Sequence, residues 1–454
     1  MKEAIGHTER DWTKGSIVGN LLLLSWPMVI NEILWAVGPT VDMIWVGRLG
    51  AASIAGVGVA GIVVMLLMAA RMGLGQGTRA LVSRFIGAGD NMLANHVAQQ
   101  AFVISGIYSV VMASIGILLA EPLLILFGLE ADVVHEGASY LRIQFIGSTA
   151  MSFWMMAEMI MYGSGDGVTP MKISVIARLV HLVLDPFLIF GWWIFPRLGV
   201  SGAALANIFA HITGTILGLW ALFSGRTRLR ITLKNFRLDL NIIWRIVKIG
   251  IPSSISGIQR SIGNLALMWF IVPFGTMAIA AHTLCQRIEM IFFMLSFGLG
   301  MAAGVLVGQN LGAGQPERAE KSGWLAAGLV TIIMVVGSVA LLLWTDGIVH
   351  IFTQEPGLEE IVSTFLRIAA VGYLVIGFTS VMMQGISGAG DTLPPMVISV
   401  SMVWLLQLPL AFLLPRITNL GVLGIRWAMV VAMVTGAVAY AIYFKLGRWK
   451  QKKV

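Results

Sequence analysis

Residues 323–345 read GWLAAGLVTIIMVVGSVALLLWT, a run that contains no charged side chain. A helix rises about 1.5 Å per residue, so a run of this length crosses a hydrocarbon core of about 30 Å. Similar runs recur along the whole chain, which is 57% hydrophobic and only 11% charged. A soluble domain carries about 25% charged residues, so the composition indicates a protein that lies in a bilayer.

The apolar runs predict an all-α polytopic membrane protein with twelve transmembrane helices. A membrane β-barrel would instead consist of short segments of alternating polarity. Polar residues at positions 2–14 precede the first run and no small-residue cleavage site follows it, so we expect the first helix to be retained. The predicted spans are residues 17–46, 53–78, 94–120, 138–162, 169–194, 200–223, 247–272, 277–308, 323–345, 365–386, 394–415 and 421–445.

The placement of the basic residues predicts the orientation of the chain. The net charge of +8 is compatible with nucleic-acid binding, but the basic residues gather in two segments that each follow an even number of predicted spans. Loops rich in Lys and Arg stay in the cytoplasm, so we expect a multi-pass inner-membrane protein with both termini cytoplasmic and no nucleic-acid partner. The loops at 121–136 and 346–360 are acidic. The two basic segments contain Arg226, Arg228, Arg230, Lys234, Arg237, Arg245 and Lys248, and Lys445, Arg448, Lys450, Lys452 and Lys453.

No sequence motif predicts a cofactor or a catalytic site. The single cysteine, Cys285, lies in an apolar stretch, which excludes a disulfide framework and a cysteine metal site. The sequence has no His cluster with metal-ligand spacing and no nucleophile motif, and the glycine-rich segment 73–77 lacks the ending of a phosphate loop. We therefore expect no enzyme activity, no metal and no cofactor.

The second half of the chain repeats the first. Pro252 repeats Pro27 with a shift of 252 − 27 = 225, and Gly421 repeats Gly199 with a shift of 222. Six helices per copy give both copies one orientation, so a pseudo-two-fold axis along the membrane normal relates them. We predict two six-helix lobes, 1–225 and 226–454, with 226–246 a basic cytoplasmic linker, that rock about a shared site. Further repeats at the shift of 225 are Gly87–Gly89 with Gly312–Gly314, Leu141–Ile143 with Leu366–Ile368, Gly165-Asp166 with Gly390-Asp391, and Pro170-Met171 with Pro395-Met396.

Three motifs add a family resemblance. Val41–Gly50 reads VDMIWVGRLG, Val307–Gly314 reads VGQNLGAG, and Leu184-Asp185-Pro186 is followed by a Phe-Gly pair. Together they resemble the multidrug and toxic compound extrusion (MATE) family over nearly the whole chain, with the DinF-like branch as the nearest pattern. The resemblance implies two six-helix lobes that exchange organic cations, drugs or metabolites outward against protons or sodium.

Asp42 and Asp185 are the candidate ion-coupling residues. An ionised carboxylate within hydrocarbon costs at least ~2.5 kcal/mol, so intramembrane acids are functional candidates. Both lie on helices predicted to run outward, Asp42 about 9 Å and Asp185 about 15 Å before the outer end. We expect them to meet in the outer half of the membrane. The alternative is that either acid is a neutral, hydrogen-bonded packing residue.

Four companions are predicted for these acids. His181 precedes Asp185 by four residues and shares its helix face, and Asn207 reaches a comparable depth on the sixth helix. In the related family pattern these two positions resemble an asparagine and a threonine, so this sequence departs there. Pro39 and Pro186 each remove a helix hydrogen bond beside an acid, which makes them hinge candidates.

The duplication places the predicted ion site in the N-terminal lobe alone. At the shift of 225, Asp42 corresponds to Leu267 and Asp185 to Leu410. A structural role common to both lobes would tend to keep an acid in each. Another branch of the resembled family carries acids in the C-terminal lobe, but Arg260 stands where its glutamate of the seventh helix aligns.

A second set of residues is predicted to line the substrate cavity. Aromatic faces attract cations and thioethers repack around varied shapes; core or lipid-facing roles are the alternative in a chain with 26 Met. For Glu289, an internal ion pair with Arg287, Arg71 or Arg260 is an alternative of equal weight to substrate binding. His211 and His282 are expected to be packing residues. The set is Phe153, Trp154, Met155, Met156, Glu289 and Arg260, with Met382 and Met383 as further candidates.

These features favour a secondary antiporter, expected to be monomeric, that exports organic cations, drugs or metabolites. A flippase of lipid-linked precursors is the alternative; it would want many cations deep in the helices, where Arg71, Arg260 and Arg426 are the candidates. A membrane-embedded enzyme is a third possibility and has no motif to support it. Two carboxylates and an imidazole favour protons as the coupling ion, because a hard cation wants several oxygen ligands, although sodium also remains possible.

Overall fold

The computed structural model describes residues 10–46, 48, 51–126, 131–234, 236–353 and 355–453. It is 87% helical and contains no β-strand in these ranges. Parts of several predicted features lie outside the described residues. These are residues 2, 3 and 9 of the polar N-terminus, residues 47, 49 and 50 of the first motif, residues 127–130 of the first acidic loop, residue 235 of the predicted linker and residue 354 of the second acidic loop.

The first half of the chain consists of α1 (Ile17–Val46), α2 (Ala51–Gly87), α3 (Asn91–Leu126), α4 (Ala131–Ser164), α5 (Val168–Phe190) and α6 (Val200–Ser224). The second half contains α7 (Leu240–Ile271), α8 (Thr276–Gly312), α9 (Pro316–Leu343), α10 (Thr345–Phe352), α11 (Pro356–Gly388), α12 (Leu393–Ser401), α13 (Leu408–Ile417) and α14 (Val422–Leu446). Short 3₁₀ turns lie at Val272–Phe274 and Arg448–Gln451, and a π-helical segment at Met402–Gln407 joins α12 to α13.

These elements confirm the predicted all-α fold of twelve spans. The segment from α12 through α13 is one continuous helical rod, and α10 is a short helix before α11. Within the described residues, nine rods meet the length and hydropathy expected of a membrane span. The other three, α2, α4 and α7, carry charges such as Arg79, Glu158 and Arg260 within their length.

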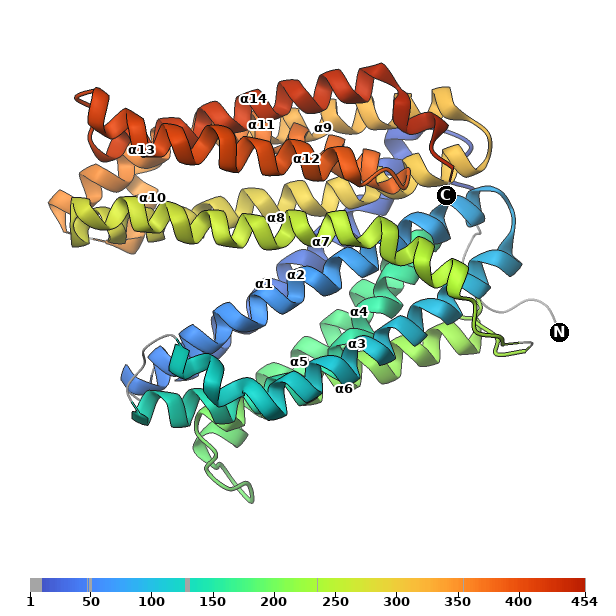
Figure 1. Ribbon diagram of the computed structural model, residues 1–454, viewed down its shortest axis with the longest axis horizontal. Coiled ribbons are helices and arrows are strands. Elements are labelled where there is room, and N and C mark those ends of the chain that lie inside the picture. The colour runs from blue at the N-terminus through green and yellow to red at the C-terminus, as the bar shows by residue number, and fades with distance from the viewer. Residues whose placement is uncertain are drawn as a thin grey trace.

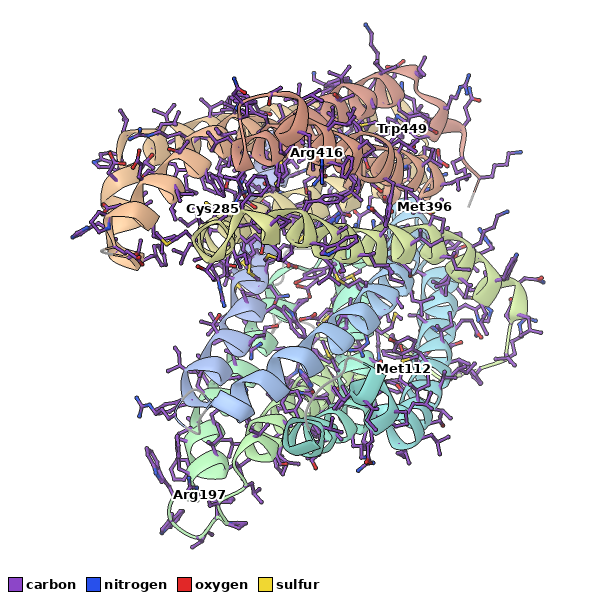
Figure 2. The ribbon with its side chains drawn as sticks, turned by 60° about the vertical axis from the view of Figure 1, so that its left-hand side comes forward. Met112, Arg197, Cys285, Met396, Arg416 and Trp449 are labelled. Atoms are coloured by element: carbon purple, nitrogen blue, oxygen red, sulfur yellow. The ribbon has the colours of Figure 1, made fainter. Side chains whose placement is uncertain are left out.

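Figure 1 shows the helices as two bundles, α1–α6 and α7–α14. The bundles meet near the two chain termini and diverge toward the opposite end, where α1 ends and α13 joins α14 (Figure 1). Figure 2 marks the diverging end by Arg197, in the loop between α5 and α6, and the other end by Trp449. The division at residue 225 stays a prediction.

The repeat in the sequence is also a repeat in geometry. Gly199 and Gly421, which precede α6 and α14, have φ 56° and 52° and ψ −130° and −133°. Positive φ is open to glycine at little cost, so both copies enter their last helix through the same turn. Ion pairs repeat as well: Arg142 lies 3.0 Å from Glu121, and Arg367 lies 3.0 Å from Asp346, with both partners displaced by the same shift of 225.

The bundles contact each other about the symmetry axis through α2 and α8. Gly87 leaves no room for a Cβ because the backbone of Gln309 lies against it, and Gly312 is closed in the same way by the backbone of Arg84. Each contact is the image of the other under the shift of 225. The C-terminal ends of α2 and α8 are polar and are buried against each other, so both helices extend beyond the predicted apolar spans.

Candidate functional site

Three side chains from two helices form a buried cluster in the N-terminal bundle. Asp42 lies near the end of α1, while His181 and Asp185 are four residues apart on one face of α5. His181 Nε2 lies 3.0 Å from Asp42 Oδ1 and 3.4 Å from Asp185 Oδ1. The side chains of His181 and Asp185 have no exposed surface, and that of Asp42 is 9% exposed. The two acids that the sequence places at similar depth therefore meet, with the imidazole between them.

Hydrogen bonds to this cluster come from α5 and α6. Asn207 Nδ2 donates to Asp42 Oδ2 over 2.6 Å. Arg178, which the sequence analysis did not single out, donates from Nη1 to His181 Nδ1 over 3.0 Å. A guanidinium is only a donor, so Nδ1 is the acceptor and we assign the imidazole proton to Nε2. His181 therefore presents an N–H group, not a lone pair, to the acids.

The two carboxylates are not equivalent. Asp42 Oδ2 accepts a hydrogen bond from Asn207 Nδ2 over 2.6 Å, and its Oδ1 lies 3.0 Å from His181 Nε2. Among the described residues, neither oxygen of Asp185 accepts a hydrogen bond, and its Oδ1 lies 3.4 Å from His181 Nε2. Asp185 is thus the acid with free capacity for a proton or a cation.

Close packing of α1 against α5 positions the cluster. Gly38 has no room for a Cβ because the guanidinium of Arg178 lies directly against it, so the glycine admits the arginine beside the acids. Both helices continue as regular helix through Pro39 and Pro186. The hinge role of the two prolines stays a prediction.

The predicted substrate cavity requires a correction. Trp154, Met155 and Met156 are buried within the N-terminal bundle, and Trp154 stacks on Trp35 with ring centroids 4.6 Å apart. Phe153 stacks on Phe102 of α3. Consecutive helix residues point about 100° apart, so four neighbours cannot all face one cavity.

Glu289 has a different partner from those predicted. Its Oε1 accepts from Arg426 Nη1 over 2.7 Å, with the arginine side chain 2% exposed. Arg260 lies instead over the ring of Phe293, 5.1 Å from its centroid. His282 is buried beside Arg426, which donates to its carbonyl oxygen. Glu289 and Arg426 line a small pocket with Tyr373 and Met429, apart from the aspartate cluster.

Two buried acids of the N-terminal bundle were missed by the sequence analysis. Glu158 is 1% exposed on α4, and Glu32 lies half-buried on α1. The signal for both was present, because each is an ionisable residue within a predicted span. At the shift of 225 they correspond to Met383 and Gly257, the same test that singled out Asp42.

Known proteins resemble the chain from end to end. The MatE family profile matches residues 27–187 and 252–413, two stretches whose starts differ by the repeat shift, 252 − 27 = 225. The chain is 26% identical over 446 residues to the probable multidrug resistance protein YoeA of Bacillus subtilis (strain 168), covering 97% of this chain and 96% of that protein. It is 25% identical over 444 residues to the probable multidrug resistance protein NorM of Thermotoga maritima, covering 96% and 93%.

The fold matches solved transporter structures as well. This chain superposes on the structure of a MOP superfamily transporter from Pyrococcus furiosus with a TM-score of 0.91. The binding pocket of that transporter is reported to have reversed polarity. The superposition covers 99% of this chain and 100% of that chain at 24% sequence identity. At this level of identity the likeness shows the common fold.

Proposed function

Because this chain belongs to the MatE family of membrane transporters, we propose that it exports organic cations, drugs or metabolites in exchange for protons by alternating access. It is a multi-span membrane protein and a transporter, not an enzyme. The names of YoeA and NorM support drugs as substrates. The basic central loop and tail support a cytoplasmic location for both termini. We also propose that the protein is a monomer in the inner membrane.

The observation that carries the coupling proposal is the cluster of Asp42, His181 and Asp185. We propose that Asp185, whose carboxyl group has no exposed surface and accepts no hydrogen bond from the described residues, is the acid that takes up the proton. Asp42 lies four residues before the end of α1, and α1 ends where the bundles diverge (Figure 1), the side from which we propose that external protons enter. A proton bound at this cluster would stabilise one arrangement of the two bundles relative to the other.

The hydrogen bonds of His181 favour protons over sodium. One ligand atom from each of Asp42, His181 and Asp185 lies within 4.8 Å of the others, a spacing open to a cation. Since His181 Nδ1 accepts from Arg178, however, the ring turns an N–H toward the acids and offers no lone pair to a metal ion. A hard cation would then depend on Asp42, Asp185 and Asn207 for oxygen ligands.

The arginines that would serve a lipid-linked pyrophosphate do not converge in this structure. Arg71 packs over Tyr108 at 5.4 Å, Arg260 packs over Phe293, and Arg426 pairs with Glu289. A flippase would instead gather cations at one site. This supports export of organic cations over lipid-linked substrates.

Efflux from proteoliposomes tests the proposal. A pH gradient without sodium should drive efflux of an organic cation in the wild type, and the shape-conserving Asp42→Asn and Asp185→Asn should abolish it. Glu320→Gln, at a surface acid that pairs with Lys450, should remain active. Efflux that needs an inward sodium gradient at constant pH would contradict proton coupling, and full activity of either aspartate variant would remove that acid from the mechanism.

A further inference from the structure

Glu158 is a buried acid without a cationic partner. Its Oε1 accepts from Ser174 Oγ over 3.0 Å and from Asn31 Nδ2 over 3.4 Å, and both donors are neutral. Within the described part of the chain, no Lys, Arg or His nitrogen lies within ion-pair distance of it. An ionised carboxylate that is 1% exposed and unpaired is costly. A protonated, uncharged form of Glu158 would avoid this cost.

The charged groups near Glu158 lie on α1 and on α5. Glu32 on α1 and Arg178 on α5 both interact with it electrostatically, and Tyr162 lies one turn further along α4. Glu32 also faces Arg79 of α2. Two other titratable residues lie on neighbouring helices. His211 of α6 packs against Trp154 and Trp35, and Arg71 of α2 lies over the ring of Tyr108 of α3.

On one face of α5, Arg178 lies between Ser174, which donates to Glu158, and His181, which accepts from Arg178. Ser174, Arg178, His181 and Asp185 are spaced by four, three and four residues and therefore lie on one face of α5. The guanidinium donates to His181 at one end of this face, and its charge acts on Asp42, Asp185 and Glu158. One positive charge thus balances acids at two depths in the bundle.

Glu32 connects Glu158 to the contact between the bundles. Part of its side chain remains accessible, while Glu158 is fully enclosed. Its neighbour Arg79 donates from Nη2 to Gln384 Oε1 of α11 over 2.7 Å and from Nη1 to the Met301 carbonyl of α8 over 3.4 Å.

The C-terminal bundle shows that the fold does not require these charges. Gly38 packs on Arg178, and at a shift of 225 Gly263 packs on Val403, so the two bundles share this packing register. Ser399 and Ser256, the counterparts of Ser174 and Asn31, approach each other directly at 3.4 Å with no acid between them. The N-terminal residues Asp42, His181, Arg178, Glu158 and Glu32 correspond to Leu267, Leu406, Val403, Met383 and Gly257, none of them charged.

We propose that Glu158, with Glu32 as its exchange partner, is a second proton-binding site that is charge-coupled to the aspartate cluster through Arg178. A proton from external water binds the carboxylate of Asp185, and Arg178 then loses part of its negative surroundings. The ionised form of Glu158 becomes favourable, so its proton passes to Glu32 and from there to cytoplasmic water. The cycle closes when the proton on Asp185 moves to the ionised Glu158, so that one proton is taken up outside and one is released inside in each cycle. This inference rests on the proposed proton coupling.

Infrared difference spectra of purified protein between acidic and alkaline pH test the site without transport. The wild type should show the carbonyl stretch of a protonated acid that is absent from Glu158→Gln and Glu158→Met and present in Glu320→Gln. Methionine is the residue of the C-terminal counterpart, so this variant should pack normally. Ser174→Ala keeps the acid and should move the pH midpoint of the band. An unchanged band in both Glu158 variants, or an unmoved midpoint in Ser174→Ala, would overturn the proposal.

Transport separates this inference from the proposed function. Glu158→Met should lose efflux driven by a pH gradient and keep substrate exchange without a gradient, because the substrate path is intact and the coupled release of a proton is lost. If Glu158→Met pumps at the wild-type rate while Asp185→Asn does not, the inference is wrong and the proposed function stands. If efflux of the wild type depends on sodium alone, the proposed coupling is wrong, and the infrared band still decides whether Glu158 binds a proton.

Discussion

Replacement of Gly87 by valine should open the contact between the two bundles. The backbone of Gln309 occupies the space in which a side chain at position 87 would lie, and the atoms in the way are main-chain atoms that cannot rotate aside. Overpacking of this kind costs about 1–3 kcal/mol. If the cost falls only on the arrangement in which the bundles touch, the ratio of closed to open molecules changes by about 5- to 150-fold.

Distances between spin labels report this ratio. Cysteines introduced at the exposed positions Met92 and Lys321, in a Cys285→Ala background, place one label on each bundle near the contact. Gly87→Val should broaden the distance distribution and move it to longer distances. Gly328→Val is the matched control, because a Cβ on Gly328 meets nothing within 4 Å. A distribution in Gly87→Val identical to that of the control would refute the reasoning.

Three further predictions follow from the same structure. A reporter fused after Lys450 should be active in the cytoplasm, and activity only outside the cell would reverse the proposed topology. Arg426→Leu should destabilise the protein by about 3–5 kcal/mol in thermal unfolding, because it leaves Glu289 buried without its partner, whereas the double replacement of both by methionine should be close to neutral. The side chain of His96 and the backbone N–H groups that bond Asp239 hold the pKa of that carboxyl below its usual value of 3.8. A lowered pKa contributes stability above the unfolded value that is lost as pH falls through the folded value, so Asp239→Asn should unfold at lower temperature than the wild type at neutral pH and show no such difference in strong acid.

The duplication is the most informative pattern in the sequence. It includes the repeat of Gly199 as Gly421, and the structure has matching turns at these two glycines. The structure adds a repeated ion pair, Arg142 with Glu121 and Arg367 with Asp346, that was not predicted. The duplication also separated Asp42 from Leu267 as an acid present in one lobe only. Applied to every ionisable residue within a span, the same comparison would have found Glu158. The sequence therefore already carried the signal for Glu158, an acid within a predicted span with an uncharged counterpart in the other lobe.

Other features needed the packed structure. Arg178 on sequence alone is one more basic residue in an apolar helix, and its role depends on Gly38, on another helix, leaving space for its guanidinium. The partner of Glu289 was sought near it in sequence and on neighbouring helices, yet it is Arg426, which lies 137 residues away. The aromatic and methionine run at 153–156 illustrates the same limit, because hydrophobic side chains in a membrane protein face lipid, core or cavity with equal ease.

The sequence by itself determined that this chain spans a membrane as twelve helices, that its halves are copies, and that Asp42 and Asp185 differ from their counterparts. These properties follow from local apolar length and from a fixed spacing, and both can be read along one dimension. Only the tertiary structure decided that Asn207 donates to Asp42, that Arg178 donates to His181, and that Ser174 donates to Glu158. Hydrogen bonds and charge pairing depend on distances of a few ångströms between helices, and the packing of α1, α4 and α5 sets those distances.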